Sequence, residues 1–502
     1  MADNEVQIVV KSSMAFFHGK YPRDLVDDAT SAKVEGAQFS PAFRARRWDG
    51  KMHLLSRVNN SFPAGVLDLV VDTLTQNGYT VLIDSFDRSS ASERLSEGIL
   101  ERWDKGFDLV DQVGPYVLRD YQVAAGQAFL AGKGNLPYNG ILHVATGGGK
   151  TVISAAIVKS LLAYDPSLIV MFLVHGKSLV TQARNVFVKC FGEENIGVIQ
   201  GDNVDIKPIT IASVDSINSK LKAEDQDIID YLQSVQLVIP DECHRFSSKT
   251  YVSILKLANP PMRLGLSGTP IKRQLDRDLL LQSQTGPVLT KISSEKLQNE
   301  GHIAKADLTT VVVQEPVMNT LAWRDAYNAL IVENHQRTAL IAKLAINRAD
   351  QGKTVLILAG NSVAFADYID AAISSMKLAS GDYNSIVNGT MPLEFVDGQF
   401  DKLRKKTLKI LTTTMLADEG IDIPSIDVLM LVGGGKSYVK AIQRIGRGLR
   451  IKEDGGNLEV VDFFDTTNPY LSKHAQARIK YYVEEKLFMT AKTITEIEIN
   501  AL

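Results

Sequence analysis

Short apolar runs rich in β-branched residues recur along the chain, and a stretch with helical spacing of apolar residues follows each run. Runs that are apolar at consecutive positions are typical of strands buried on both faces of a parallel sheet, with helical crossovers between them. Examples are residues 139–145, 167–174, 209–214, 236–240, 353–359, 408–414 and 427–432. They form two groups, separated by the region from Thr285 to Val317. The pattern predicts an α/β protein with two doubly wound lobes joined by a linker.

The chain has a different texture on either side of these groups. The first part combines an aromatic and basic stretch, FSPAFRARRWDGKMHLL (39–55), with an apolar helical segment and the strand-like GYTVLID (78–84). Residues 87–98 are polar and predict a linker. After about Ser472 the chain is charged, with helical spacing and no strand pattern. We therefore expect an N-terminal α+β domain at 1–110, lobes at 111–300 and 301–470, and a helical segment at 471–502.

Composition limits the class of protein. A chain of 502 residues with 45% hydrophobic and 23% charged residues is typical of a soluble globular protein with several domains. Its net charge is −3, so any nucleic-acid contact needs a local basic patch. Two cysteines, Cys190 and Cys243, provide neither a disulfide framework nor a four-ligand zinc site. Without a signal-peptide pattern or an apolar run of membrane length, we expect a cytoplasmic protein.

The sequence VATGGGKT (144–151) follows a predicted strand and precedes a helical stretch. A glycine-rich turn at a helix N-terminus arranges backbone N–H groups around a polyphosphate. Lys150 would reach the β- and γ-phosphates, and the Thr151 hydroxyl would bind Mg²⁺. The predicted nucleotide contacts of this loop are Thr146, Gly147, Gly148, Gly149, Lys150 and Thr151. The usual pattern has glycine six residues before the lysine, where this chain has Val144. The alternative is a glycine-rich turn with an incidental lysine.

The sequence VIPDECH (238–244) ends another apolar run. Asp241 would emerge at the carboxyl end of a parallel strand, where open α/β sheets bind ligands. There Asp241 could hold Mg²⁺, while Glu242 could orient and deprotonate the attacking water. Alone, an Asp-Glu pair is a common surface dipeptide. Its place after a strand and downstream of the phosphate loop favours catalysis.

The sequence QRIGRGLR (443–450) lies in the second group of strands. Helical spacing would put Gln443, Arg447 and Arg450 on one face. Arginines from one lobe can stabilise the charge that develops on the γ-phosphate during hydrolysis. The alternative is a basic surface helix.

These three motifs, in this order, resemble those of superfamily 2 helicases. Further elements match the family at LRDYQ (118–122), FLVHGKSLVTQ (172–182), ITIASVDSI (209–217), LSGTP (266–270) and TTTMLADEGIDIP (412–424). The resemblance implies two RecA-like lobes and the use of ATP and Mg²⁺. It also implies that Gln122 contacts adenine and that LSGTP couples hydrolysis to DNA binding. Finally, it implies that Ser213 and Thr413 contact the DNA strand, and that Gly420 and Asp422 face the nucleotide.

The N-terminal part is similar to that of the phage UvsW-type helicases, which carry Phe/Tyr-x-Pro, Trp-Asp-Gly and Pro-x-Gly elements in this order. Here these elements are FSP (39–41), WDG (48–50) and PAG (63–65), and HAQARIKYY (474–482) is also similar. The resemblance implies remodelling of stalled forks, migration of Holliday junctions and unwinding of RNA–DNA hybrids. Expected partners are branched, forked or single-stranded DNA, with a single-strand-binding protein as a further candidate. We expect a monomer or weak oligomer in the host cytoplasm.

The aromatic and basic stretch supplies the candidate DNA patch. Arg44, Arg46, Arg47 and Lys51 could neutralise phosphates, and Arg57 follows them, with Phe39, Phe43 and Trp48 interleaved. For Trp48 we favour packing in the domain's own core. The alternative for the arginines is a solvated basic loop. A second basic run, from Lys402 to Lys409, predicts a solvated helix face.

Three functional hypotheses follow. The leading one is an ATP-dependent DNA helicase that remodels branched DNA. A second is an RNA helicase or the translocase subunit of a restriction system. A third is a nucleotide-gated nucleic-acid-binding module that does not hydrolyse ATP, although Glu242, Arg447 and Arg450 are all present.

Overall fold

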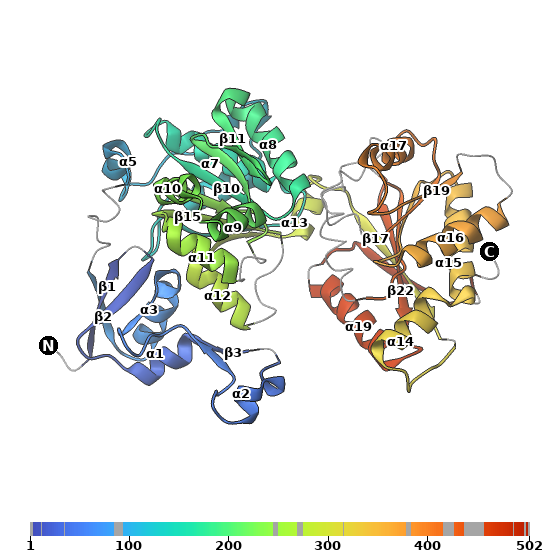
Figure 1. Ribbon diagram of the computed structural model, residues 1–502, viewed down its shortest axis with the longest axis horizontal. Helices are drawn as coiled ribbons and strands as arrows, with labels where there is room; N and C mark the ends of the chain where they lie inside the picture. Colours follow the sequence, from blue (N-terminus) through green and yellow to red (C-terminus); the bar gives the residue numbers. More distant parts are fainter. Residues whose placement is uncertain are drawn as a thin grey trace. The chain divides into compact units, whose positions relative to one another are not determined.

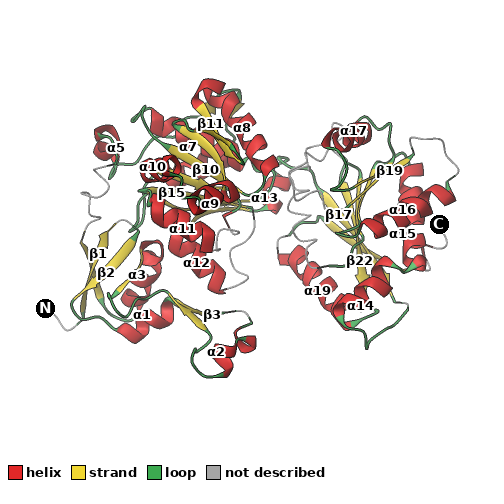
Figure 2. Ribbon diagram, in the orientation of Figure 1, coloured by secondary structure: helices red, strands yellow, loops and turns green. Residues whose placement is uncertain are grey.

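The computed structural model divides the chain into two compact units (Figure 1). The first comprises Met1–Val144 and Gly149–Ile292, and the second comprises Ser293–Leu502 together with the short stretch Ala145–Gly148. Parallel sheets flanked by helices dominate both units (Figure 2), which confirms the predicted α/β class. The structure describes residues 4–11, 13–34, 36–84, 94–243, 249–268, 275–314, 316–377, 383–414, 426–435, 456–484, 486–495 and 498–499.

The N-terminal domain is a four-stranded sheet covered by two helices. In spatial order the strands are β5 (Ser61–Pro63), β2 (Met14–His18), β1 (Glu5–Lys11) and β6 (Thr80–Asp84), and the helices are α1 (Arg23–Ala29) and α3 (Leu67–Gln76). Alternate residues of β1, Val6, Ile8 and Val10, point into the core. Leu67, Val70 and Leu74 of α3 close it from the helix side. The α+β prediction is confirmed.

A smaller hairpin projects from this domain (Figure 1). It consists of β3 (Ser31–Lys33) and β4 (Lys51–His53), and a loop with the short helix α2 (Pro41–Arg44) joins the two strands. Gly50, in this loop, has φ +79°, and a Cβ there would lie 2.8 Å from the Phe43 ring. The turn that returns the loop to β4 therefore requires glycine.

The N-terminal domain packs directly on the first lobe. Gly65 lies against helix α12 (Leu275–Thr285), and a Cβ on Gly65 would sit 2.2 Å from the Gln282 carbonyl oxygen. Nearby, the Asp68 carboxylate accepts hydrogen bonds from the backbone and side chain of Asn135, at 3.2 and 2.6 Å. The glycine of the Pro-x-Gly element thus allows the two backbones to meet.

The first described residue of the predicted linker, Arg94, is fixed to the first lobe by hydrogen bonds. The Arg94 guanidinium donates to the carbonyls of Val235, Ala258 and Asn259 at 2.8, 3.0 and 2.8 Å. It also donates to the Gln233 carbonyl. Burial of the guanidinium lowers the pKa of Arg94. The preceding residues, 85–93, lie outside the described residues.

The first lobe contains an eight-stranded sheet that is parallel except for β12 at one edge. In spatial order its strands are β12 (Asn203–Asp205), β11 (Ile196–Gln200), β13 (Ile209–Ser213), β10 (Val170–Val174), β14 (Leu237–Pro240), β15 (Met262–Ser267), β9 (Asn139–Val144) and β16 (Val288–Ile292). Every residue of β9, β10, β13, β14 and β15 is buried, which explains the continuous apolar runs.

Helices cover both faces of this sheet (Figure 2). The helices of the first lobe are α5 (Glu97–Arg102), α6 (Asp120–Leu130), α7 (Lys150–Leu162), α8 (Lys177–Phe191), α9 (Val214–Lys222), α10 (Gln226–Ser234), α11 (Lys249–Ala258) and α12. A small two-stranded ladder, β7 (Gln112–Val113) with β8 (Tyr116–Val117), precedes α6. The core formed with α9, α10 and α11 includes Met171, Val238 and Leu255.

The second lobe contains a seven-stranded sheet whose paired strands all run parallel. In spatial order the strands are β19 (Asn384–Val387), β20 (Ile410–Thr413), β18 (Val355–Leu358), β21 (Val428–Leu431), β22 (Leu458–Asp465), β17 (Ala306–Val313) and β23 (Thr490–Thr495). One face packs against α14 (Trp323–Tyr327), α15 (His335–Asp350) and α16 (Val363–Met376). The other packs against α17 (Leu393–Arg404) and α19 (Pro469–Glu484).

Two expectations need correction. The region between the lobes is not a plain linker, because it contains β16, helix α13 (Ser294–Asn299) and the long strand β17. The C-terminal segment has the expected helix, α19, but it also supplies β23, which pairs in parallel with β17. The β-branched threonines of TAKTIT suit the exposed edge of a sheet, and a pairing partner more than 170 positions earlier cannot be seen in local periodicity. Within the described residues, no helix is long and apolar enough to cross a membrane.

Candidate functional site

The predicted phosphate loop joins β9 to α7. Gly147 and Gly149 adopt left-handed φ angles of +85° and +76°, and helix α7 begins at Lys150 immediately afterwards. A Cβ on Gly149 would also lie 2.4 Å from the Gln122 amide nitrogen. The left-handed conformation therefore favours glycine at both positions. The first turn of α7 directs backbone N–H groups toward the loop, as binding of phosphate requires.

Gln122, which is predicted to contact adenine, lies beside this loop. It stands at the third position of α6, and its side-chain oxygen accepts a hydrogen bond of 2.9 Å from the Arg119 backbone N–H. The side chain is 6% exposed. This capping interaction fixes the orientation of the amide next to Gly149, so its position is set before any base arrives.

The predicted catalytic pair, Asp241 and Glu242, follows β14. The Asp241 N–H donates to the Leu173 carbonyl at 2.9 Å, which holds Asp241 at the carboxyl end of the sheet. Its Oδ1 accepts a hydrogen bond of 2.9 Å from the Glu242 N–H. Glu242 has φ +52°, a conformation unfavourable for a residue with a long side chain. The resulting turn brings Glu242 Oε1 within 3.4 Å of Lys150 Nζ.

The LSGTP element also reaches this pair. Gly268 follows β15, and its N–H donates to Glu242 Oε2 at 3.4 Å. The Glu242 carboxylate is thus shared between the phosphate-loop lysine and the start of the predicted coupling motif. The sequence indicated each motif but not this contact, because register between strands decides which loop ends meet. Thr269 and Pro270 lie outside the described residues.

The donors present suit a magnesium nucleotide. The glycine cradle and the helix N-terminus favour phosphate, and the Thr151 hydroxyl and Asp241 carboxylate supply the oxygen ligands that Mg²⁺ prefers. Lys150 is 8% exposed. Because its ammonium group is largely shielded from water, it interacts more strongly with nearby charges. Among the described residues, no group of three or more His, Cys, Asp or Glu side chains is arranged to hold a metal ion.

Several predicted site residues lie outside the described residues. They are Gly420, Asp422, Gln443, Arg447 and Arg450. Their roles stay predictions from the sequence. His244, which follows Asp241 and Glu242 after Cys243, also lies outside the described residues.

The two predicted strand-contacting hydroxyls lie at the carboxyl ends of strands. Ser213 ends β13 and Thr413 ends β20, at 4% and 2% exposure. Thr413 Oγ1 donates to the Thr414 carbonyl at 2.7 Å. Both positions belong to the sheet edge where α/β proteins bind ligands, and their contacts with DNA stay predictions.

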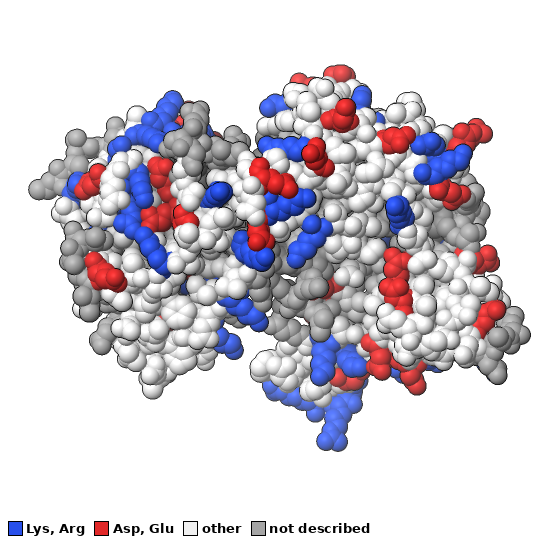
Figure 3. Space-filling model, turned by 180° about the vertical axis from the view of Figure 1, so that it is seen from behind, with Lys and Arg blue, Asp and Glu red and all other residues white. Residues whose placement is uncertain are grey.

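The candidate DNA patch lies on the projecting hairpin, and Lys and Arg side chains gather at this lower end of the molecule in Figure 3. Arg44, Arg46 and Arg47 are exposed, and Phe39 is 70% exposed. Trp48 is only half-buried and donates from Nε1 to the Lys51 carbonyl at 2.7 Å. The expectation that Trp48 packs in the core of the domain is therefore wrong. Trp48 and Lys51 are three positions apart, so this hydrogen bond is local and holds the indole against the hairpin loop.

A charged cluster fixes the base of the hairpin. His53 contacts Asp27 through Nδ1 and Asp49 through Nε2, both at 2.9 Å, and Arg57 contacts Asp27 at 2.9 Å. The hydrogen bond with Asp27, together with that with Asp49, raises the pKa of His53. Burial opposes ionisation of Asp27, but the hydrogen bonds with Arg57 and His53 outweigh it and lower the pKa of Asp27. The cluster therefore favours a doubly protonated imidazole.

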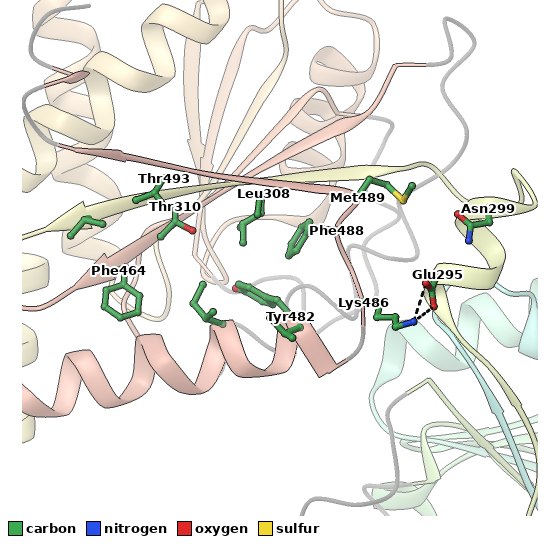
Figure 4. A pocket seen from close by; sticks show the side chains of 14 residues that line it. Glu295, Asn299, Leu308, Thr310, Phe464, Tyr482, Lys486, Phe488, Met489 and Thr493 are labelled. Carbon is green, nitrogen blue, oxygen red and sulfur yellow. Dashed lines mark hydrogen bonds and ion pairs between the residues drawn. The ribbon is translucent and has the colours of Figure 1, made fainter.

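The second lobe contains a cavity of about 720 Å³ between α19 and the sheet (Figure 4). Leu308, Phe464, Tyr482 and Phe488 contribute apolar walls, and Lys486 pairs with Glu295 at 2.9 Å at one end. Of the described residues that are predicted to bind nucleotide or DNA, none lines this cavity.

Comparison with protein families identifies the chain. Residues 24–84 match the family described as DNA helicase UvsW, N-terminal. Residues 115–272 match Type III restriction enzyme, res subunit, and residues 336–452 match Helicase conserved C-terminal domain. The chain belongs to the UvsW-like helicases of superfamily 2. The two matched helicase regions include the predicted phosphate loop, the predicted catalytic pair and the predicted arginine motif.

Individual relatives agree with this assignment. The helicase is 23% identical to the ATP-dependent DNA helicase uvsW of Enterobacteria phage T4, over 93% of this chain and 94% of that protein. It is 24% identical to Putative helicase 22 of Sulfolobus islandicus filamentous virus, over 68% of this chain but only 63% of that protein. It therefore spans less than two thirds of the viral relative.

The fold also matches solved structures. The fragment of a putative HsdR subunit of a type I restriction enzyme from Vibrio vulnificus YJ016 aligns with a TM-score of 0.57 at 21% identity, over 81% of this chain and 73% of that chain. This likeness supports the two RecA-like lobes of the helicase.

Proposed function

We propose that the chain, an ATP-dependent DNA helicase, remodels branched DNA: it would reverse stalled forks, migrate Holliday junctions and unwind R-loops in recombination, repair and replication restart. The observation that supports this proposal is the projecting basic hairpin on a domain docked against the lobe that holds the phosphate loop. A motor lobe that carries a second DNA-binding element can hold one arm of a junction while it moves along another.

ATP hydrolysis would use the residues gathered around Lys150. In this proposal Lys150 contacts the β- and γ-phosphates, and Thr151 with Asp241 holds Mg²⁺. Glu242 accepts a proton from the attacking water. Gln122 contacts adenine. Gly420 and Asp422, which belong to the sequence of the second lobe, also contact the nucleotide.

The arginine motif would complete catalysis. We propose that Gln443, Arg447 and Arg450 stabilise the negative charge that develops in the transition state. Such stabilisation would make hydrolysis depend on the arrangement of the lobes, which is how a translocase turns chemistry into movement.

DNA would be held mainly through its phosphates. Arg44, Arg46, Arg47 and Lys51 would contact the backbone of one arm, while Ser213 and Thr413 contact the tracked strand. Phosphate contacts position a duplex without reading bases, so we expect binding that depends on structure and tolerates sequence. A single-strand-binding protein is the candidate partner, and we propose a cytoplasmic monomer or weak oligomer.

A second candidate function is the translocase subunit of a restriction system, which the match of residues 115–272 favours. The match of residues 24–84 to the UvsW N-terminal family favours branched DNA instead. Unwinding of an RNA substrate is a further alternative.

The decisive experiment compares ATP hydrolysis and strand displacement on duplex, single-stranded, forked, four-way and RNA–DNA hybrid substrates. The proposal expects the highest activity on forked and four-way DNA, and lower activity on these two after combined Arg44→Ala, Arg46→Ala and Arg47→Ala substitution. Equal activity on linear duplex and junctions would contradict the branched-DNA role. Preference for duplex RNA, included as a sixth substrate, would favour the RNA-helicase alternative.

A further inference from the structure

Two fully buried arginines in the second lobe have no role in the proposed chemistry. Arg478, in α19, is 1% exposed and makes a two-pronged pair with Asp462 of β22, at 2.9 and 3.0 Å. Arg337, in α15, is also 1% exposed and pairs with Asp465 at 2.7 Å. Burying an ion pair stabilises a fold little or not at all relative to apolar side chains of the same size. Stability alone therefore does not account for these two pairs.

Both arginines have donors left over, and these donors hold the same stretch of backbone. Arg337 donates to the Val432 carbonyl at 2.8 Å, and Arg478 donates to the Gly435 carbonyl at 3.3 Å. These two carbonyls belong to the four residues that follow β21. Arg478 also donates to the Phe463 carbonyl at 2.8 Å, which ties it to β22.

Other contacts fix the same stretch. The Tyr482 hydroxyl donates to Asp462 at 2.8 Å, so the carboxylate that orients Arg478 is itself held from α19. Tyr482 also forms a wall of the cavity in Figure 4. Gly434 has φ +65°, and a Cβ there would lie 2.9 Å from the Ile331 side chain. The backbone that follows β21 is thus held in place both by hydrogen bonds from the arginines and by packing of Gly434 against Ile331.

The chain that leaves this point carries the arginine motif. Gly435 is the last described residue before 436–455, which includes Gln443, Arg447 and Arg450. Burial opposes the charge of Arg478, but the neighbouring Asp462 outweighs it and raises the pKa of Arg478, so the guanidinium stays charged with all its donors.

We propose that Arg478, oriented by Asp462 and Tyr482 and supported by Arg337, is a positioning residue for the catalytic arginines. It holds the backbone at Gly435, from which the chain enters the arginine motif. This inference rests on the proposed role of Arg447 and Arg450. Misplacing a transition-state contact by about 1 Å can cost about 100-fold in rate.

The test is Arg478→Lys, which retains the charge but cannot donate to Asp462, Phe463 and Gly435 together. We expect kcat of DNA-stimulated ATP hydrolysis to fall roughly 10- to 100-fold, with KM for ATP changed less than about twofold. Tyr482→Phe should lower kcat less, because it removes one donor to Asp462 and leaves Arg478 in place.

The matched control is Arg348→Lys in the same lobe. Arg348 makes a similar two-pronged pair with Glu459, at 2.9 and 3.0 Å, but donates to no residue of 432–435. It should lower the melting temperature as Arg478→Lys does and leave kcat unchanged. Equal losses of kcat in both variants, or an unchanged kcat in Arg478→Lys, would overturn the positioning role.

A double variant separates this inference from the proposed function. If Arg478 acts through Arg447, Arg478→Lys should reduce kcat much less in an Arg447→Ala background than in the wild type. Full additivity would overturn the inference alone. Full ATP hydrolysis by Arg447→Ala and by Arg450→Ala would instead overturn the proposed function of the arginine motif.

Discussion

The Lys150 ammonium lies 3.4 Å from Oε1 of Glu242, and the two side chains are 8% and 15% exposed. The lysine predicted to bind phosphate therefore also balances the carboxylate predicted to activate water. Because both groups are largely removed from solvent, loss of either charge leaves the other poorly compensated. Gly268 shares the same carboxylate at 3.4 Å, so this contact connects three sequence motifs.

Lys150→Ala should abolish DNA-stimulated ATP hydrolysis. The substitution removes the cation from the phosphate loop, and we expect a loss of about 100-fold or more, with weaker binding of a fluorescent ATP analogue. Lys159→Ala is the control, because Lys159 is an exposed residue in the last turn of the same helix. Full turnover by Lys150→Ala would contradict the phosphate role.

Glu242→Gln should separate nucleotide binding from hydrolysis. Glutamine retains an oxygen that can accept the Gly268 N–H, but it cannot take a proton from water. We expect turnover to fall roughly 10²- to 10⁴-fold while ATP still binds. A stable complex with both ATP and forked DNA should form in gel-shift assays. Unchanged turnover would remove Glu242 from the position of general base.

Replacing Arg44, Arg46 and Arg47 together by alanine should weaken binding to forked DNA and reduce its salt dependence. Each lost phosphate contact should lower the slope of log affinity against log salt by about 0.9. The control replaces the exposed Lys402, Lys405 and Lys406, which removes the same charge from the last turn of α17 and the two residues after the helix. If both triple variants behave alike, total charge rather than the hairpin determines binding.

The base of the hairpin should loosen at alkaline pH. Hydrogen bonds with Asp27 and Asp49 raise the pKa of His53 above its usual 6.5, so this stabilisation is complete below about pH 6.5. It is lost as pH rises through the raised value. Amide hydrogen exchange in β4, corrected for intrinsic rates, should therefore show less protection at about pH 8.5 than at about pH 5.5. His53→Gln should remove this difference, and a difference that persists would assign it to another group.

Gly65→Ala should disturb the docking of the N-terminal domain. The new Cβ would lie 2.2 Å from the Gln282 carbonyl oxygen, so one backbone must move, at a cost of about 1–3 kcal/mol. We expect a lower melting temperature and poorer strand displacement per ATP hydrolysed. Gly398→Ala in α17 is the control, because a Cβ there meets no atom within 4 Å. Equal effects of both changes would argue against tight docking at Gly65.

Local sequence determined much of the fold. Buried parallel strands need apolar residues on both faces, so the runs at β9, β10, β13, β14, β18, β20 and β21 could be read directly. The phosphate loop could also be predicted, because its glycines, Lys150 and Thr151 are contiguous in the chain. Functional residues that are neighbours in the chain form a motif that can be recognised in the sequence alone.

Tertiary structure alone decided which distant groups meet. The contacts of Glu242 with Lys150 and Gly268 depend on strand order, and no spacing in the chain encodes them. The same holds for Arg478, whose partner Asp462 precedes it by 16 positions and whose third contact, Gly435, by 43. Strand β23 was missed because it is a short, polar edge strand, and its pairing with β17 leaves no pattern in the local sequence. Pairing and burial are properties of the folded chain, so they appear only once its parts are assembled.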